Sequence, residues 1–222
     1  MTTESFSFQK GDALLIVDAQ NDFLPGGALA IERGDEIVPV LNRYLEKARE
    51  AGIPVYASRD WHPVGHLSFQ EQGGEWPPHC VQDTEGAAFV ESLNLPADAV
   101  MVTKGVLLDQ DQNSAFDKTG LDRQLKKKGV RRLVVGGLAQ GDCVLATVLD
   151  ARSASFDVLL LEEATRPVTT EGGRKALTEM IKAGAKFVDA ELDVCVRAPE
   201  WAEHQRPGEP EDACDDGRSG KI

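Results

Sequence analysis

The chain has 222 residues, of which 41% are hydrophobic and 27% charged, and its formal net charge at pH 7 is −13. This length suits one large globular domain. The acidic excess argues against a nucleic-acid partner, because a phosphate backbone binds clustered Lys and Arg. No run of about 18 apolar residues predicts a membrane span, and no basic segment followed by an apolar run marks an export signal. We therefore expect a cytoplasmic protein without a membrane partner.

Six short apolar runs alternate with segments of helical periodicity along most of the chain. Such runs are typical of strands buried on both faces of a parallel sheet. The expected strands are residues 13–17, 55–58, 100–103, 133–138, 158–161 and 186–188, and the expected helices are residues 35–51, 121–128, 143–153 and 172–183. Repeated strand and helix units predict parallel pairing with right-handed crossovers. We therefore predict an α/β fold, a three-layer sandwich in which helices cover both faces of a six-stranded, mostly parallel sheet.

The C-terminal end differs in composition from the rest of the chain. From residue 198 onward Pro, Gly, Asp and Glu predominate, which is typical of a mobile tail. We therefore predict a folded domain over residues 1–197 and an acidic, Pro- and Gly-rich tail over residues 198–222. The four cysteines are widely spaced, and without an export signal we expect them to be free thiols.

A group of candidate metal ligands follows the second expected strand. Three of the four histidines lie close to Asp60, and the connection over residues 61–96 is long enough to be a binding loop. The candidate ligands are Asp60, His62, His66 and His79. Carboxylates and imidazoles suit Zn, Fe or Mn. The alternative is a packed loop with ordinary polar histidines, but the clustering favours one divalent metal ion, with Zn as the first choice.

Three other polar residues follow separate expected strands, namely Asp18, Lys104 and Cys143. The carboxyl edge of an open parallel sheet is where active sites are built. Singly, each residue has an ordinary alternative, as a turn cap, a surface charge or a small buried side chain. Their shared edge beside the metal loop favours a joint site. The start of the helix expected after the fourth strand would also favour a thiolate at Cys143.

This trio suits amide hydrolysis through a thioester. Asp18 would take the proton from the Cys143 thiol and later deliver it to departing ammonia, while Lys104 holds the negative charges in place. Backbone N–H groups of Ala139 and Cys143 would meet the tetrahedral oxyanion. Water would then cleave the thioester.

Five motifs occur in order between Asp12 and about Asp189: V-D-A-Q-N-D-F, S-R-D-W-H-P-V-G-H-L-S-F, W-P-P-H-C, T-K-G and G-L-A-x-x-x-C-V. Together they resemble the nicotinamidase branch of the isochorismatase-like cysteine hydrolases. The resemblance implies the six-stranded sheet, the trio as a catalytic triad, and a cis peptide between Leu138 and Ala139. It further implies that Asp60, His62 and His79 bind the metal, with His66 a ligand in some relatives only. The pyridine nitrogen of nicotinamide would bind that metal.

The resemblance also implies a substrate and a pathway, the hydrolysis of nicotinamide to nicotinate and ammonia in NAD salvage, with pyrazinamide as a surrogate. Phe23 and Trp76 match the positions that sandwich the pyridine ring in the family. In two places the chain departs from the family pattern. Gln140-Gly141-Asp142 stands where relatives usually read T-D-Y, and Asn113 stands where an aromatic residue is common.

These departures leave other functions open. One alternative is a related enzyme acting on another small amide, and another is an isochorismatase, against which the metal set counts. A catalytically silent binding module of the same fold is a third, against which the intact trio counts. A homo-oligomer is compatible with the sequence, because symmetric dimers are the commonest assembly.

Overall fold

The computed structural model describes residues 6–189 and 194–196, so the tail expected over residues 198–222 lies outside the described residues. Within the described part, one seven-stranded sheet has the order β3-β2-β1-β4-β5-β6-β7. The strands are β1 (Asp12–Val17), β2 (Val55–Asp60), β3 (Val100–Lys104), β4 (Arg132–Gly137), β5 (Asp157–Thr165), β6 (Lys186–Asp189) and β7 (Val194–Val196). All pairs from β3 through β6 are parallel, which confirms the predicted six-stranded parallel sheet.

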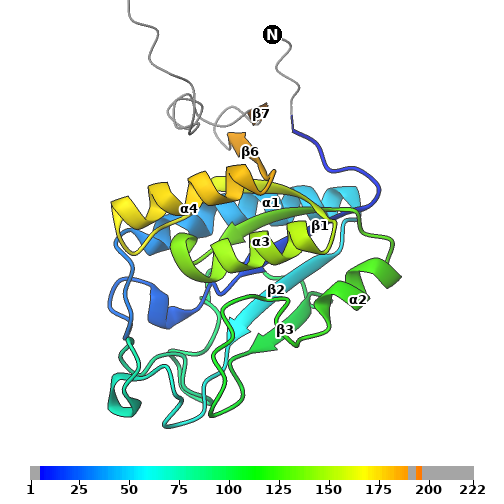
Figure 1. Cartoon of the computed structure of the whole chain (residues 1–222). Helices are drawn as coiled ribbons and strands as arrows, with labels where there is room; N and C mark the ends of the chain where they lie inside the picture. The colour runs from blue at the N-terminus through cyan, green and yellow to red at the C-terminus, as the bar shows by residue number, and fades with distance from the viewer. Residues whose placement is uncertain (1–5, 190–193, 197–222) are drawn as a thin grey trace, which may run out of the picture.

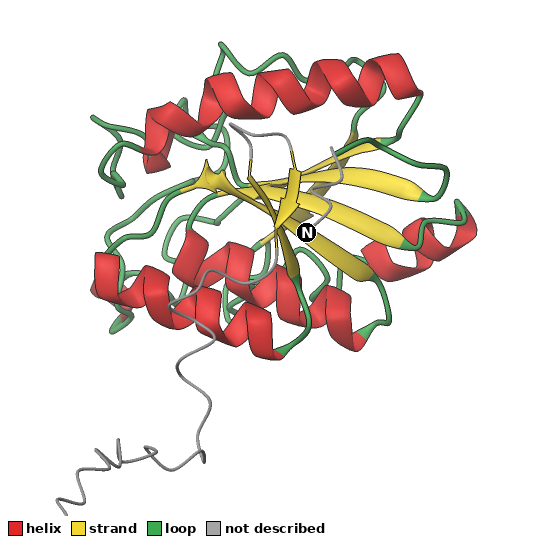
Figure 2. Ribbon diagram, turned by 90° about the horizontal axis from the view of Figure 1, so that it is seen from above, coloured by secondary structure: helices red, strands yellow, loops and turns green. Residues whose placement is uncertain are grey.

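Helices cover both faces of this sheet, as predicted (Figure 2). The helices are α1 (Ile37–Ala51), α2 (Leu121–Lys127), α3 (Leu145–Ser153) and α4 (Thr170–Lys182). Alternate side chains of a strand point to opposite faces. In β1, Leu14 and Ile16 therefore pack in the core under α1, whereas Leu15 and Val17 pack in the core under α2, α3 and α4. These residues are fully buried, which explains why β1 reads as a continuous apolar run.

The structure differs from the prediction mainly at element ends. β7 pairs antiparallel with β6 and was not predicted, because three residues are too few to show a period. The helix expected from Cys143 begins at Leu145, and a π-helical turn, η4 (Gln140–Val144), precedes it. β5 continues to Thr165, beyond the expected residue 161, because Glu162 and Glu163 interrupt the apolar run without ending the strand.

The chain leaves the central strand β1 in both directions, toward β2 and β3 on one side and toward β4, β5 and β6 on the other. This reversal of strand order opens a crevice at the carboxyl ends of the strands. The long connection between β2 and β3 gathers at the same edge (Figure 1). No helix in the described part of the chain is long and apolar enough to cross a membrane.

Candidate active site

The candidate residues stand at the carboxyl ends of four adjacent strands (Figure 1). Asp18 directly follows β1, Asp60 ends β2 and Lys104 ends β3, and the register of β2 with β3 places Asp60 opposite Lys104. Cys143 lies in η4, which follows β4. The structure therefore brings the expected trio to one edge, beside the first expected metal ligand.

Lys104 is the centre of this group. Its Nζ lies 2.9 Å from Asp18 Oδ2 and 2.6 Å from Asp60 Oδ1, and it donates to Cys143 Sγ at 3.3 Å. The side chain is fully buried. Burial alone would lower the pKa of Lys104, but the neighbouring Asp18 and Asp60 carboxylates raise it well above its ordinary value. Lys104 is therefore a permanent ammonium that bridges two carboxylates and the thiol.

A hydrogen bond to Oδ1, the carboxylate oxygen that does not contact Lys104, also holds Asp18 in place. The Ser58 hydroxyl donates to Asp18 Oδ1 at 2.7 Å, and the backbone N–H of Asp18 donates to Ser58 O at 3.1 Å. Complete burial raises the pKa of Asp18, while Lys104 and Ser58 act in the opposite direction. Ligand atoms of Asp18, Asp60 and Cys143 lie within 4.8 Å of one another. The carboxylate thus lies close enough to the sulfur to exchange a proton with it.

The surroundings of Cys143 favour the thiol, whereas the start of the helix alone would favour the thiolate. Burial raises the pKa of Cys143 well above its usual range; Lys104 lowers it, while Asp18 and Asp60 raise it further. These effects outweigh any contribution of the helical turn. Ionisation of the sulfur therefore requires a base, and Asp18 is the neighbouring candidate. Among the described cysteines, Cys80 and Cys143 are both free, as expected.

The donor set of a metal site is present in the loop after β2. Asp60, His62 and His79 are buried, and their ligand atoms lie within 4.8 Å of one another. His62 Nδ1 faces the His79 carbonyl at 3.2 Å, and His79 Nδ1 faces the Pro77 carbonyl at 2.8 Å. Because a carbonyl oxygen only accepts, each Nδ1 carries the proton and each Nε2 keeps its lone pair. Burial lowers the pKa of His62 to about 3, so this ring is neutral. These residues fit a divalent cation.

The structure does not bring His66 into that group. Its Nε2 faces the Gln110 carbonyl at 3.1 Å, and its Nδ1 faces Ser68 Oγ at 2.8 Å. Nε2 must therefore carry the proton, and Nδ1 accepts from the Ser68 hydroxyl. Both nitrogens are occupied, and the ring packs against His62 with centroids 4.3 Å apart. In this structure His66 packs beside the group formed by Asp60, His62 and His79 and contributes no atom to it.

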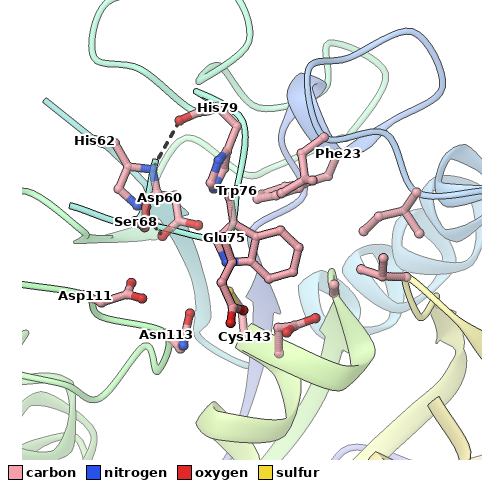
Figure 3. Close-up of a pocket in the computed structure, with 15 residues that line it drawn as sticks. Phe23, Asp60, His62, Ser68, Glu75, Trp76, His79, Asp111, Asn113 and Cys143 are labelled. Carbon is pink, nitrogen blue, oxygen red and sulfur yellow. Dashed lines mark hydrogen bonds and ion pairs between the residues drawn. The ribbon is translucent and has the colours of Figure 1, made fainter. Parts of the chain in front are cut away.

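A pocket beside Cys143 is lined by this residue and by the candidate metal ligands Asp60, His62 and His79 (Figure 3). Phe23 and Trp76, the expected ring-binding residues, both line it. Its other lining residues are Leu29, Ile31, Asp60, His62, Ser68, Glu75, His79, Asp111, Asn113, Ala139, Asp142, Cys143 and Val168. The peptide between Leu138 and Ala139 is cis, as the resemblance implies. The pocket thus combines an aromatic wall, a metal-ligand group and a thiol.

Three supporting residues were missed by sequence reasoning. Besides Ser58, Gln20 holds Asp60 in place: its Nε2 donates to Asp60 O at 2.8 Å, and its Oε1 accepts from Asp60 N at 2.8 Å. Gly105 has a φ of +66°, and a Cβ there would lie 2.7 Å from the His62 ring. Gln20 and Gly105 occur within the quoted motifs, and Ser58 precedes Asp60 by two residues on the same strand. These positions in the sequence could have identified the three residues as supports of the site.

Comparisons with known proteins agree with this geometry. The isochorismatase domain family matches residues 12–192. A nicotinamidase from Escherichia coli (strain K12) is 39% identical over 78% of this chain and 92% of its own length. The crystal structure of a Pyrococcus horikoshii pyrazinamidase in complex with zinc has a TM-score of 0.78 and 45% identity, covering 81% of this chain and 99% of that one.

A structure from L. infantum in complex with nicotinate has a TM-score of 0.77 and 34% identity, covering 85% of this chain and 98% of that one. The family match over residues 12–192 spans β1 through β6 and every candidate site residue. The chain therefore belongs to the isochorismatase family, alongside nicotinamidases and pyrazinamidases.

Proposed function

We propose that this amidohydrolase converts nicotinamide to nicotinate and ammonia through a thioester on Cys143, and that it serves NAD salvage. The observation that carries the proposal is the position of Lys104, whose Nζ lies within 3.3 Å of Cys143 Sγ and contacts both Asp18 and Asp60. One buried cation thus joins the base, the nucleophile and the first metal ligand. The relatives named nicotinamidase and the nicotinate complex support the choice of substrate.

The first half of the reaction forms the thioester. Asp18 takes the proton from Cys143 Sγ, and the sulfur attacks the amide carbon while Lys104 holds the transient negative charge. The N–H groups of Ala139 and Cys143 donate to the oxyanion. Asp18 then delivers its proton to the amide nitrogen, the C–N bond breaks, and ammonia leaves.

The second half returns the enzyme to its starting state. Asp18 takes a proton from water, and the resulting hydroxide attacks the thioester carbon. When the C–S bond breaks, Asp18 returns the proton to Cys143, and the nicotinic acid that leaves loses its own proton to solvent and becomes nicotinate. Asp18 therefore accepts and donates a proton once in each half, and both functions require a carboxylate whose pKa is raised by burial.

Asp60, His62 and His79 would hold one divalent cation, for which Zn is the first choice and Fe and Mn are alternatives. When bound, the ion supplies a Lewis acid that accepts the pyridine nitrogen lone pair. Phe23 and Trp76 would stack on the ring, because flat aromatic faces suit a planar heteroaromatic amide. A zinc complex of a 45% identical pyrazinamidase supports the metal and its type. In this proposal His66 positions His62 instead of binding the ion.

A second candidate is an amidohydrolase of the same mechanism with a different small amide as substrate. It is favoured by Asn113 and Asp142, polar residues in the pocket wall where the family commonly has aromatic ones. The catalytic trio and metal-ligand group would be unchanged in that case.

Ammonia release tests the proposal. Wild-type protein is assayed on nicotinamide and pyrazinamide, beside Cys143→Ala and beside wild type treated with a chelator. We expect activity in the wild type alone, with recovery when metal is restored. Activity on another amide but not on nicotinamide would make the second candidate correct. Activity retained by Cys143→Ala would overturn the mechanism.

A further inference from the structure

Three carboxylates that the proposed mechanism does not use line the pocket, namely Glu75, Asp111 and Asp142, and the inference concerns Asp142 and Glu75. Asp142 directly precedes Cys143 in η4, and Glu75 directly precedes Trp76 in the long connection. Both side chains line the pocket together with Cys143. Figure 3 shows Glu75 on the Cys143 side of the pocket, across from Phe23 and His79.

Neither carboxylate is neutralised by a neighbour. Across residues 6–189 and 194–196, neither side chain has a hydrogen-bond or ion-pair partner, and no Lys or Arg lines the pocket. Lys104 lies below the floor and is already bridged to Asp18 and Asp60. Burial and then the charge of Glu75 raise the pKa of Asp142, so the charge of Glu75 acts on Asp142 across the opening. The wall therefore carries negative charge that no side chain lining the pocket neutralises, and the proposed cation at Asp60, His62 and His79 would be the positive charge in this pocket.

The charge of this wall affects the substrate and the product of the proposed reaction differently. The substrate is a neutral amide, whereas the product is a carboxylate that forms at the carbon attacked by Cys143, beside Asp142. Repulsion between like charges is strongest where water is partly excluded, and half-buried Asp142 lies in such a place. The charge of the wall consequently acts on the product and leaves the substrate almost unaffected.

We propose that Asp142 and Glu75 are specificity-determining residues that repel the carboxylate product and so limit product inhibition. This inference rests on the proposed amide hydrolysis in the same pocket. Asp142 stands where relatives usually carry tyrosine, so the property distinguishes this chain from the general family pattern. It also implies that amides bearing an additional carboxylate are poor substrates.

The test compares product and substrate in charge-neutral variants. Asp142→Asn, Glu75→Gln and the double variant keep side-chain size and remove charge. Glu50→Gln, an exposed position in the last turn of α1 at the opposite edge of the sheet, is the matched control. For each metal-loaded protein, the KM for nicotinamide and the inhibition constant for nicotinate are measured at low and high salt.

We expect the nicotinate inhibition constant to fall about three- to tenfold for each charge removed, and this difference to shrink at high salt. The KM for nicotinamide should change by less than about twofold, and the control should match the wild type. Unchanged nicotinate inhibition, or equal changes in both constants, would overturn the inference. If the wild type releases no ammonia from nicotinamide, the proposed substrate has failed instead. The same comparison then uses the amide that is hydrolysed and its acid, so the two failures remain distinct.

Discussion

The hydrogen bond from Ser58 to Asp18 offers a direct test of the proposed base. Ser58 is fully buried, and its hydroxyl donates to Asp18 Oδ1 at 2.7 Å. A hydrogen bond to a charged group contributes about 1.5–3 kcal/mol, and about 1.4 kcal/mol corresponds to one pKa unit. This bond favours the ionised carboxylate and lowers the pKa of Asp18. Removing it in Ser58→Ala should therefore raise the pKa of Asp18 further.

The expected result is a shift in the pH profile of kcat/KM. Asp18 must be ionised to accept the thiol proton, so activity falls as pH drops through its pKa, and a raised pKa moves this acid limb to higher pH. Thr147→Val is the matched control, because Thr147 is equally buried and its hydroxyl accepts from Ala115 N at 3.0 Å, away from Asp18. An acid limb that stays in place in a folded Ser58→Ala protein would refute Asp18 as the base.

Three further substitutions probe the supporting contacts. Lys104→Met leaves two buried carboxylates without their cation. We therefore expect inactive protein whose unfolding free energy, measured by urea titration, is lower by about 3–5 kcal/mol. Unchanged stability would contradict the conclusion that Lys104 bridges Asp18 and Asp60. Gln20→Glu replaces the donor to Asp60 O by an acceptor, and metal affinity measured by calorimetry should fall about 10- to 100-fold. Gly105→Ala places a methyl group 2.7 Å from the His62 ring and should also weaken metal binding, whereas equal affinity would show that the loop adapts.

The edge of the sheet could be predicted from the sequence because it depends on local patterns. Each continuously apolar run ends in a polar residue, and parallel pairing brings all carboxyl ends together. That reasoning placed Asp18, Lys104 and Cys143 at one edge, and the structure confirms the location. It could not show that Lys104 lies opposite Asp60, because strand register depends on pairing between distant segments.

Properties that depend on long-range contacts were not predictable. The raised pKa of the Cys143 thiol follows from burial and from the carboxylates of Asp18, directly after β1, and Asp60, at the end of β2. His66 is kept out of the metal-ligand group by the carbonyl of Gln110, which is 44 residues away in the chain. Spacing along a sequence indicates which side chains can meet. Spacing does not indicate which hydrogen bonds each of those side chains will form in the folded protein.

The site divides its tasks between two kinds of structure. The groups proposed to make and break bonds stand at or beside the ends of three packed strands, β1, β3 and β4, where neighbouring strands fix the backbone. The groups that contact the rest of the substrate, such as Phe23 and Trp76, come from connecting segments. Of the departures from the family pattern, Asn113 and Asp142 line the pocket, Gln140 and Gly141 do not, and none falls on Asp18, Lys104 or Cys143. A wall can therefore change which amide and which product are tolerated while the thioester chemistry stays the same. By this argument, substitutions at Asn113 and Asp142 should alter KM and product inhibition, whereas substitutions in the trio should alter kcat.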